Sequence, residues 1–219
     1  MTEAPQKPTR QGQAQKRAAI LAAARELFAR DGVERTSMDA VAARAGVSKR
    51  TVYDYYGDKR RLLLGVIENA GEAALSTLRQ LIDQHLADAA ADRGPAALER
   101  AVVGFASGLG RSQLTSPDYA AAVKLIAENE ALLPELEDHP LDDAHAQALA
   151  ERLAHFAGLG LLDIEDPWLA AEHFHALTTL RVLHEPIRRR ADAEHVQRVV
   201  IDGAQAFLRA YASRSEADE

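Results

Sequence analysis

Apolar side chains recur along most of the chain at spacings of three and four residues, which is the pattern of amphipathic helices. The valines and isoleucines are scattered singly, and they do not alternate with polar residues as they would in a half-buried strand. A first helix is predicted near residues 14–30, with Gly32 as its left-handed stop. Its four apolar positions share one face and are Ile20, Ala24, Leu27 and Phe28. The pattern predicts an all-α protein.

Later helix starts are marked by a proline that follows a glycine or a small polar residue. Proline lacks a backbone N–H, which would have no partner in the first helical turn, so it is tolerated there. The three pairs are Gly94-Pro95, Ser116-Pro117 and Asp166-Pro167. They predict helices over about 95–111, 117–131 and 167–185, and the apolar spacing predicts others over about 58–91, 141–158 and 193–212. Residues 1–13 and 214–219 lack an apolar period, so we expect a flexible basic arm and a disordered tail.

Residues 38–56, MDAVAARAGVSKRTVYDYY, have the spacing of two short helices that cross around a tight turn. Gly46 occupies the turn, where a positive φ is needed that a side chain would oppose. Ser48 is placed to cap the second helix, and Thr36 with Asp39 resembles a capping box for the first. The apolar residues that would clamp the pair are Val41, Val47 and Val52. The segment is therefore predicted to be a helix-turn-helix.

The outer face of the second helix carries hydrogen-bond donors and rings that suit DNA groove edges and phosphates. These residues are Ser48, Lys49, Arg50, Thr51, Tyr53 and Tyr55. An ordinary hairpin in a helical bundle is the alternative, but its solvated face would include more acidic residues. Arg50 and Asp54 form an i, i+4 pair, so we expect Asp54 to hold the guanidinium at one base edge. The pattern indicates that this helix reads DNA.

The charge distribution separates a basic head from an acidic body. The net charge is −7, yet residues 1–65 hold 13 Lys and Arg against 7 Asp and Glu, whereas residues 66–219 hold 13 against 26. This division fits a phosphate-binding module joined to a part that does not touch nucleic acid. Asp58 resembles a helix N-cap, and three cations at 59–61 follow it, where the helix dipole disfavours positive charge. DNA phosphate would compensate them, although a solvated basic run would look the same.

The stretch TSMDAVAARAGVSKRTVYDYYGDKRRLL, with FARDGVERT before it, resembles the TetR/AcrR family of bacterial transcriptional regulators. The resemblance implies an N-terminal three-helix DNA-binding domain, at residues 14–60, and a helical effector-binding and dimerisation domain, at residues 61–213. It also implies a buried aromatic ring at Tyr56, a phosphate contact at Lys59, and DNA contacts at Thr36, Ser48, Lys49, Thr51, Tyr53 and Tyr55.

Three positions depart from this family pattern. Arg50 stands where glycine is frequent, Asp54 where a neutral residue is common, and Arg60 where Glu is frequent. Because Arg50 and Arg60 are cations in the predicted reader, we add both to the predicted DNA-binding residues. Because these three positions differ, the base preference of the relatives does not transfer to this chain.

The acidic body also resembles the variable C-terminal half of such regulators, through KLIAENEALLPEL and GLGLLDIEDPWLAAEHFHAL. The resemblance implies that the last two long helices pack against those of a second copy in a homodimer. The candidate interface residues are Val196, Val199, Val200, Gly203, Phe207 and Tyr211. An intramolecular core would show the same apolar pattern, so the sequence leaves both possibilities open.

A pocket for a small-molecule effector would lie among the middle helices, where the family places it. Gly104, Gly108 and Gly110 weaken the helix predicted there, which indicates either close helix packing or space for a ligand. The candidate wall residues are Phe105, Leu109, Glu128, Phe156, Phe174 and Leu177. Because this set is mostly apolar, we expect a hydrophobic or aromatic effector.

The composition narrows the remaining function classes. The chain has no cysteine, which removes disulfides and thiolate sites, and neither His173 with His175 nor Glu151 with His155 has obvious further metal ligands. We expect no metal and no cofactor. The absence of an apolar run of membrane length and of a signal peptide predicts a cytoplasmic protein.

The motif and the family resemblance together predict a repressor that binds double-stranded DNA as a homodimer over an inverted repeat and that an effector releases. An activator, or a regulator whose effector is another protein, is the alternative. A helical enzyme is a much weaker one, because no nucleophile, metal set or phosphate-binding loop is present.

Overall fold

The computed structural model describes residues 10–87, 94–112, 114–129, 133–134 and 140–213. In this part of the chain the regular structure is helical, and the β pairing consists of one isolated bridge between Leu162 and Ala212. The predicted all-α class is confirmed. The chain forms two compact units, one built from residues up to Gly71 with 121–137, and the other from 72–120 with 138–219. The sequence had suggested a boundary after residue 60.

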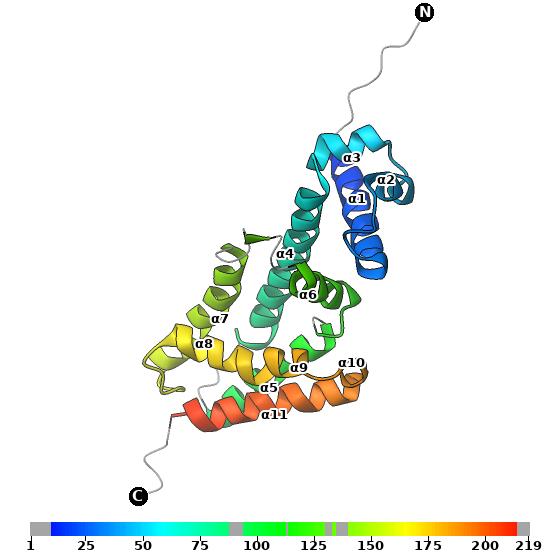
Figure 1. The fold of residues 1–219 in the computed structure, drawn as a ribbon. Coiled ribbons are helices and arrows are strands. Elements are labelled where there is room, and N and C mark those ends of the chain that lie inside the picture. Colours follow the sequence, from blue (N-terminus) through cyan, green and yellow to red (C-terminus); the bar gives the residue numbers. More distant parts are fainter. Residues whose placement is uncertain (1–9, 88–93, 113, 130–132, 135–139, 214–219) are drawn as a thin grey trace, which may run out of the picture. The chain divides into compact units, whose positions relative to one another are not determined.

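Three helices and parts of two others form the first unit (Figure 1). The three are α1 (Arg10–Asp31), α2 (Met38–Ala45) and α3 (Lys49–Tyr56), and they are joined by the beginning of α4 (Lys59–His85) and the end of α6 (Pro117–Asn129). The predicted apolar face of α1 is buried in the core, where its side chains pack with those of α2, α3 and α4. Leu125 and Leu133 complete this core and are fully buried, although they come from much later in the sequence.

The first helix begins earlier than predicted. Residues 10–13 were assigned to the flexible arm, but they are helical in the structure, while the rest of the predicted arm lies outside the described residues. Gln, Ala, Lys and Arg are good helix formers, and extending an existing helix is easier than nucleating one. The hydroxyl of Tyr55 also donates to the carbonyl oxygen of Gln13 at 3.2 Å, which ties this extension to α3. The predicted tail, 214–219, lies outside the described residues.

The second unit is organised around α11 (Ala193–Tyr211), which packs against α5 (Pro95–Ser112) and the π-helix η4 (Ala176–Leu180) (Figure 1). The helix α7 (Pro140–Gly158) packs in turn against α8 (Pro167–His175). Three aromatic rings meet at its centre: Phe105 and Phe174 have ring centroids 5.5 Å apart, and Phe174 and Phe207 have theirs 5.4 Å apart. The predicted starts of α5, α6 and α8 are confirmed, and α4 ends at His85, earlier than expected.

The predicted helix over about 167–185 is present, because the chain is helical without interruption from Pro167 to Leu183, but the π-helical turn within it was not predicted. The chain forms α8, the π-helix η4 and the short α9 (Arg181–Leu183) in succession, followed by a further turn, α10 (Ile187–Arg190), that the sequence pattern did not indicate. A Cβ added at Gly203 of α11 would overlap the Leu177 carbonyl oxygen and lie 2.8 Å from the Leu177 carbonyl carbon. The backbones of α11 and η4 therefore approach each other closely, a tertiary contact that local sequence patterns do not reveal.

A buried carboxylate links these short helices. Glu185 is 5% exposed and accepts hydrogen bonds from Arg181 in α9 and from Arg189 in α10. The hydrogen bond from Arg181 is the main cause that holds the pKa of Glu185 below its ordinary value, and Arg189 acts in the same direction. His195 of α11 lies 3.6 Å from the same carboxylate, so the group joins three helices.

Candidate DNA-binding site

The turn between α2 and α3 is built by two caps and a glycine. Ser37 accepts a hydrogen bond from the Ala40 amide at 3.1 Å, and Ser48 accepts one from the Thr51 amide at the same distance. Gly46 ends α2 with φ +66°, in the left-handed region that favours glycine. The predicted turn at Gly46 and the predicted helix cap at Ser48 are confirmed. The predicted cap of α2 was wrong, because the capping side chain belongs to Ser37 and not to Thr36.

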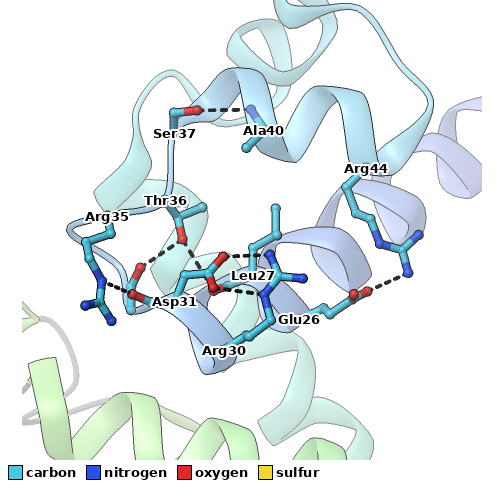
Figure 2. Close-up of polar contacts among 10 residues, drawn as sticks. Glu26, Leu27, Arg30, Asp31, Arg35, Thr36, Ser37, Ala40 and Arg44 are labelled. Atoms are coloured by element: carbon cyan, nitrogen blue, oxygen red, sulfur yellow. Dashed lines mark hydrogen bonds and ion pairs between the residues drawn. The ribbon is translucent and has the colours of Figure 1, made fainter.

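Thr36 is turned into the protein instead. Its hydroxyl donates to the Gly32 carbonyl oxygen at 2.8 Å and lies 3.4 Å from that of Leu27, so it fastens the end of α1 to the loop before α2 (Figure 2). Thr36 is only 4% exposed, whereas the predicted DNA contacts in α3 are more exposed to solvent. Arg44, in the last turn of α2, adds an ion pair with Glu26 of α1 at 2.6 Å, which links the two helices directly (Figure 2).

The apolar clamp of the motif is also in place. Val41 and Val52 are fully buried between the helices, and Val47 packs beside them half-buried. Tyr56 is buried as the family resemblance implied, and a Cβ at Gly65 of α4 would lie 2.9 Å from its ring. Burial raises the pKa of Tyr56 above its ordinary value, with Arg17 opposing the shift. The orientation of α3 is therefore set by packing on both of its neighbours.

The opposite face of α3 is open to solvent. The side chain of Arg50 is 89% exposed, and the rings of Tyr53 and Tyr55 are also exposed. Ser48 and Thr51 are partly occupied with each other, since their hydroxyl oxygens lie 2.8 Å apart. The structure thus brings six of the predicted DNA contacts onto or beside one exposed helical face, Ser48, Lys49, Arg50, Thr51, Tyr53 and Tyr55.

Both cations of α3 have carboxylate neighbours. The ammonium of Lys49 lies 2.9 Å from one oxygen of Asp39 in α2 and 3.0 Å from the other. The hydrogen bond to Asp39 raises the pKa of Lys49 above its ordinary value. The Nε of Arg50 lies 3.8 Å from Asp54, which confirms the i, i+4 pair that the sequence predicted. The Lys49 partner was missed because Asp39 is ten residues away on another helix.

The start of α4 adds further positive charge to the motif. Asp58 accepts a hydrogen bond from the Arg61 amide at 2.8 Å, which confirms Asp58 as the N-cap. Lys59 donates to the Glu34 carbonyl oxygen at 2.9 Å, and the Arg60 side chain is exposed. These cations follow α3 directly in the chain, so the caps of α3 and α4 position them together.

The candidate effector residues are only partly brought together. Four lie in the core of the second unit, Phe105, Leu109, Phe156 and Phe174. Leu177 is exposed on η4, and Glu128 belongs to the first unit, where its carboxylate lies 3.7 Å from the ammonium of Lys124.

The glycines of α5 favour close packing over space for a ligand. A Cβ at Gly108 would lie 2.5 Å from the Leu81 side chain, and one at Gly110 would lie 2.5 Å from that of Gln197. At Gly104 the nearest atom would be His85 Nδ1, at 2.9 Å. The neighbouring helices therefore use the missing side chains to approach α5.

The candidate dimer residues divide in a similar way. Four are buried within their own chain, Val196, Val200, Gly203 and Phe207. Val199 and Tyr211 are half-buried, and the Tyr211 hydroxyl lies 2.5 Å from His173 Nδ1. The arrangement favours the intramolecular core that the sequence left open. Large apolar side chains are exposed instead on α8 and η4, at Trp168, Leu169, Leu177 and Leu180. In the sequence, the spacing of apolar residues over 167–180 is the pattern that could have identified these exposed side chains.

No group of three or more His, Asp or Glu side chains that could hold a metal ion occurs within the described ranges. None of the helices seen there is both long enough and apolar enough to cross a membrane.

The fold and the capped, exposed α3 define the class of helix-turn-helix transcriptional regulators. The family model for bacterial regulatory proteins of the tetR family matches residues 20–66, and the one for the C-terminal domain of AefR-like transcriptional repressors matches 109–213. Together they cover more than half of the chain. The chain belongs to the TetR family, and the resemblance drawn from the sequence is confirmed. Regulators of this family bind DNA as dimers and respond to small molecules.

Individual relatives agree with this assignment. The HTH-type transcriptional activator FasR of Mycolicibacterium smegmatis is 29% identical over 119 residues, which are 52% of this chain and 54% of FasR. The match thus spans about half the length of that relative. A TetR-family transcriptional regulator of Mesorhizobium loti MAFF303099 superposes with a TM-score of 0.70 at 22% identity, over 93% of this chain and 99% of that one. The flavonoid-responsive regulator FrrA gives a TM-score of 0.59 at 26% identity, over 92% and 100% of the two chains.

Proposed function

We propose that this regulator is a repressor that binds an inverted-repeat operator as a homodimer and leaves it when a small molecule binds. The observation that carries the proposal is the exposed face of α3, a capped helix that offers cations, hydroxyls and tyrosine rings to solvent. Such a recognition helix enters the major groove with its N-terminal residues on base edges. The N-terminal residues of α3 are Lys49 and Arg50, the two cations of that helix.

The proposed contacts fall into two groups. On and beside α3, Arg50 is the principal reader of a base edge, because a guanidinium can donate twice to guanine and because its side chain is 89% exposed, against 58% for Lys49. The other proposed contacts of this group are Ser48, Lys49, Thr51, Tyr53 and Tyr55. At the start of α4, Lys59 and Arg60 bind backbone phosphate and set the register of the helix on the duplex. Thr36 supports the loop from within.

A homodimer would account for the apolar side chains exposed on α8 and η4. Trp168, Leu169, Leu177 and Leu180 each expose more than a third of their surface on one helical stretch, and apolar side chains grouped on the surface in this way are typical of an interface. Val199 and Tyr211 are the members of the predicted interface that a second copy can still reach. Two-fold symmetry would then present two α3 helices to successive major grooves about 34–36 Å apart, which requires an inverted repeat.

The effector is proposed to be hydrophobic or aromatic and to bind in the second unit. The rings of Phe105, Phe156 and Phe174 supply apolar surface there, and FrrA, 26% identical, is a flavonoid-responsive regulator. Flavonoids are aromatic molecules. A ligand that binds the DNA-free form more tightly shifts the equilibrium away from the operator, by roughly 1–3 kcal/mol in a typical coupled pair of sites.

Repression is favoured over activation by the C-terminal match, whose family model describes a transcriptional repressor. Activation remains the second candidate because FasR is named an activator and matches about half of the chain. Deleting the gene separates the two. Transcripts of neighbouring genes rise if the protein represses them and fall if it activates them.

The test of the main proposal is a selection of bound duplexes from a random pool with the full chain, repeated with flavonoids and other aromatic compounds. We expect an enriched inverted repeat whose occupancy falls with at least one compound. A pool with no enriched sequence contradicts the proposal. The variant Arg50→Ala is expected to weaken the consensus at one position of the operator. Arg79 is an exposed arginine of the second unit, so Arg79→Ala serves as the matched control and should leave the consensus unchanged.

A further inference from the structure

Lys49, the first residue of the recognition helix, is held by a carboxylate of the other helix in the motif. Both oxygens of Asp39 lie within 3.0 Å of its ammonium, and Asp39 belongs to the first turn of α2. The position of Asp39 suits that helix start, since a negative charge there complements the helix dipole. The ammonium therefore has a defined partner before any DNA arrives.

This pair is open to exchange. The side chains of Lys49 and Asp39 are 58% and 63% exposed, and solvent-exposed ion pairs contribute little to stability. Breaking the pair is therefore a small cost that a favourable DNA contact can offset. Tyr53 supports the ammonium from the same helix, because Lys49 Nζ lies 5.9 Å from the centroid of its ring.

A duplex offers phosphates as competing partners for the ammonium. Binding to unrelated DNA depends almost entirely on such neutralised phosphates, whereas binding to an operator also gains free energy from base edges. When Lys49 leaves Asp39 for a phosphate, the carboxylate loses its cation close to a polyanion. This opposes the transfer wherever base contacts do not favour it.

We propose that Asp39 is a positioning residue for Lys49: it keeps Lys49 from the phosphates of unrelated DNA and releases it at the operator. The inference rests on the proposed function, since it needs an operator read by α3. At the operator, base contacts draw α3 fully into the groove and Lys49 passes to the DNA. On other sequences α3 is held less deeply, and the ammonium stays with Asp39.

The test is Asp39→Asn in the full chain, with affinity for the selected operator and for an unrelated duplex measured across salt concentrations. Freeing one cation should steepen the plot of log affinity against log salt by about 1 for the unrelated duplex and raise its affinity about fivefold near 0.1 M salt. The operator slope should stay unchanged, while the operator affinity should rise at least as much, because the variant no longer has a pair to break there. If the salt-dependence slope steepens equally for both duplexes, or for neither of them, the proposed role of Asp39 is wrong.

Two control variants separate the role of Asp39 from a general effect of net charge. Asp83→Asn removes an exposed carboxylate from the second unit and should leave both slopes unchanged. In the double variant Asp39→Asn with Lys49→Gln, the gain on unrelated DNA should disappear, because the cation that Asp39 restrains is gone. A gain that persists in the double variant contradicts the proposal.

Lys49→Gln alone provides a test that does not depend on Asp39→Asn folding. It should flatten the operator slope by about 1 and affect the unrelated duplex much less. Similar flattening for both duplexes contradicts the proposal. A selection without any enriched sequence overturns the proposed function and this inference together, whereas an enriched operator with equal slope changes overturns only the role of Asp39.

Discussion

Replacing Gly203 by alanine is expected to destabilise the second unit. The added Cβ would overlap the Leu177 carbonyl oxygen and would also lie 2.8 Å from the carbonyl carbon and 3.1 Å from Thr178 Cγ2. Backbone atoms cannot swing aside as the end of a flexible side chain can, so α11 must move away from η4. Val200 and Phe207 are fully buried on α11 and would lose contacts as it moves. Overpacking of this kind costs about 1–3 kcal/mol, and we expect the upper end.

For a chain of this size, 1 kcal/mol corresponds to about 2–4 °C in Tm, so the variant should melt about 6–12 °C below the wild type. Thermal unfolding followed by circular dichroism measures the change. Gly158→Ala is the matched control: a Cβ there meets no atom within 4 Å, and alanine in a helix is neutral to stabilising.

Two outcomes would refute this reasoning. A Gly203→Ala variant with the Tm of the wild type would show that the backbones of α11 and η4 are not in close contact. A decrease in Tm that grows strongly as the protein is diluted would place Gly203 in a contact between copies of the chain. Only an intermolecular contact depends on protein concentration in this way.

The remaining predictions concern charge. Replacing Lys59 and Arg60 together by alanine should flatten the salt dependence of operator binding by about 1–2, and an unchanged slope would show that neither contacts phosphate. Asp54→Ala should alter the sequence selected from a random pool, because the neighbouring guanidinium is freed, and an identical consensus would contradict this. Glu185→Gln should lower the free energy of unfolding near neutral pH. The pKa of Glu185 is depressed in the folded state, chiefly by Arg181, so its stabilising effect is present above the unfolded pKa of about 4.3 and is lost as pH falls through the folded value. Urea unfolding of both proteins from pH 6 to 3 should therefore show the difference shrinking, and a constant difference would argue against the ion pair as its source.

Features determined by a few neighbouring residues were predictable from the sequence. The proline-marked starts of α5, α6 and α8, the left-handed Gly46 and the Ser48 cap all depend on local backbone chemistry and were confirmed. The cap of α2 was misplaced by one residue because Thr36 and Ser37 offer the same hydroxyl chemistry. Only their different surroundings, a buried carbonyl for one and a free helix start for the other, distinguish them.

Features that depend on distant parts of the chain could not be predicted. The π-helical turn η4 packs closely against Gly203, which lies more than twenty residues away, and the partner of Lys49 lies on the preceding helix. Burial presents a similar difficulty. An apolar residue such as Val200 or Phe105 has the same sequence signature in a core, a dimer interface or a ligand pocket, and here both lie in the core of their own chain. Periodicity shows which side of a helix is buried, and it does not show what covers that side.

The two leucines that close the first unit limit how freely this DNA-binding head can be transplanted. Leu125 and Leu133 fill its core from a segment that follows the head by more than fifty positions, and Lys124 beside them donates to the Ala29 carbonyl oxygen. A chimaera cut after Gly71 would leave their places empty and expose the surface they cover, and a cavity the size of a leucine side chain costs about 2–5 kcal/mol. Protein engineers, and gene fusions in evolution, must therefore move this later segment with the head or supply equivalent side chains from the new sensor domain.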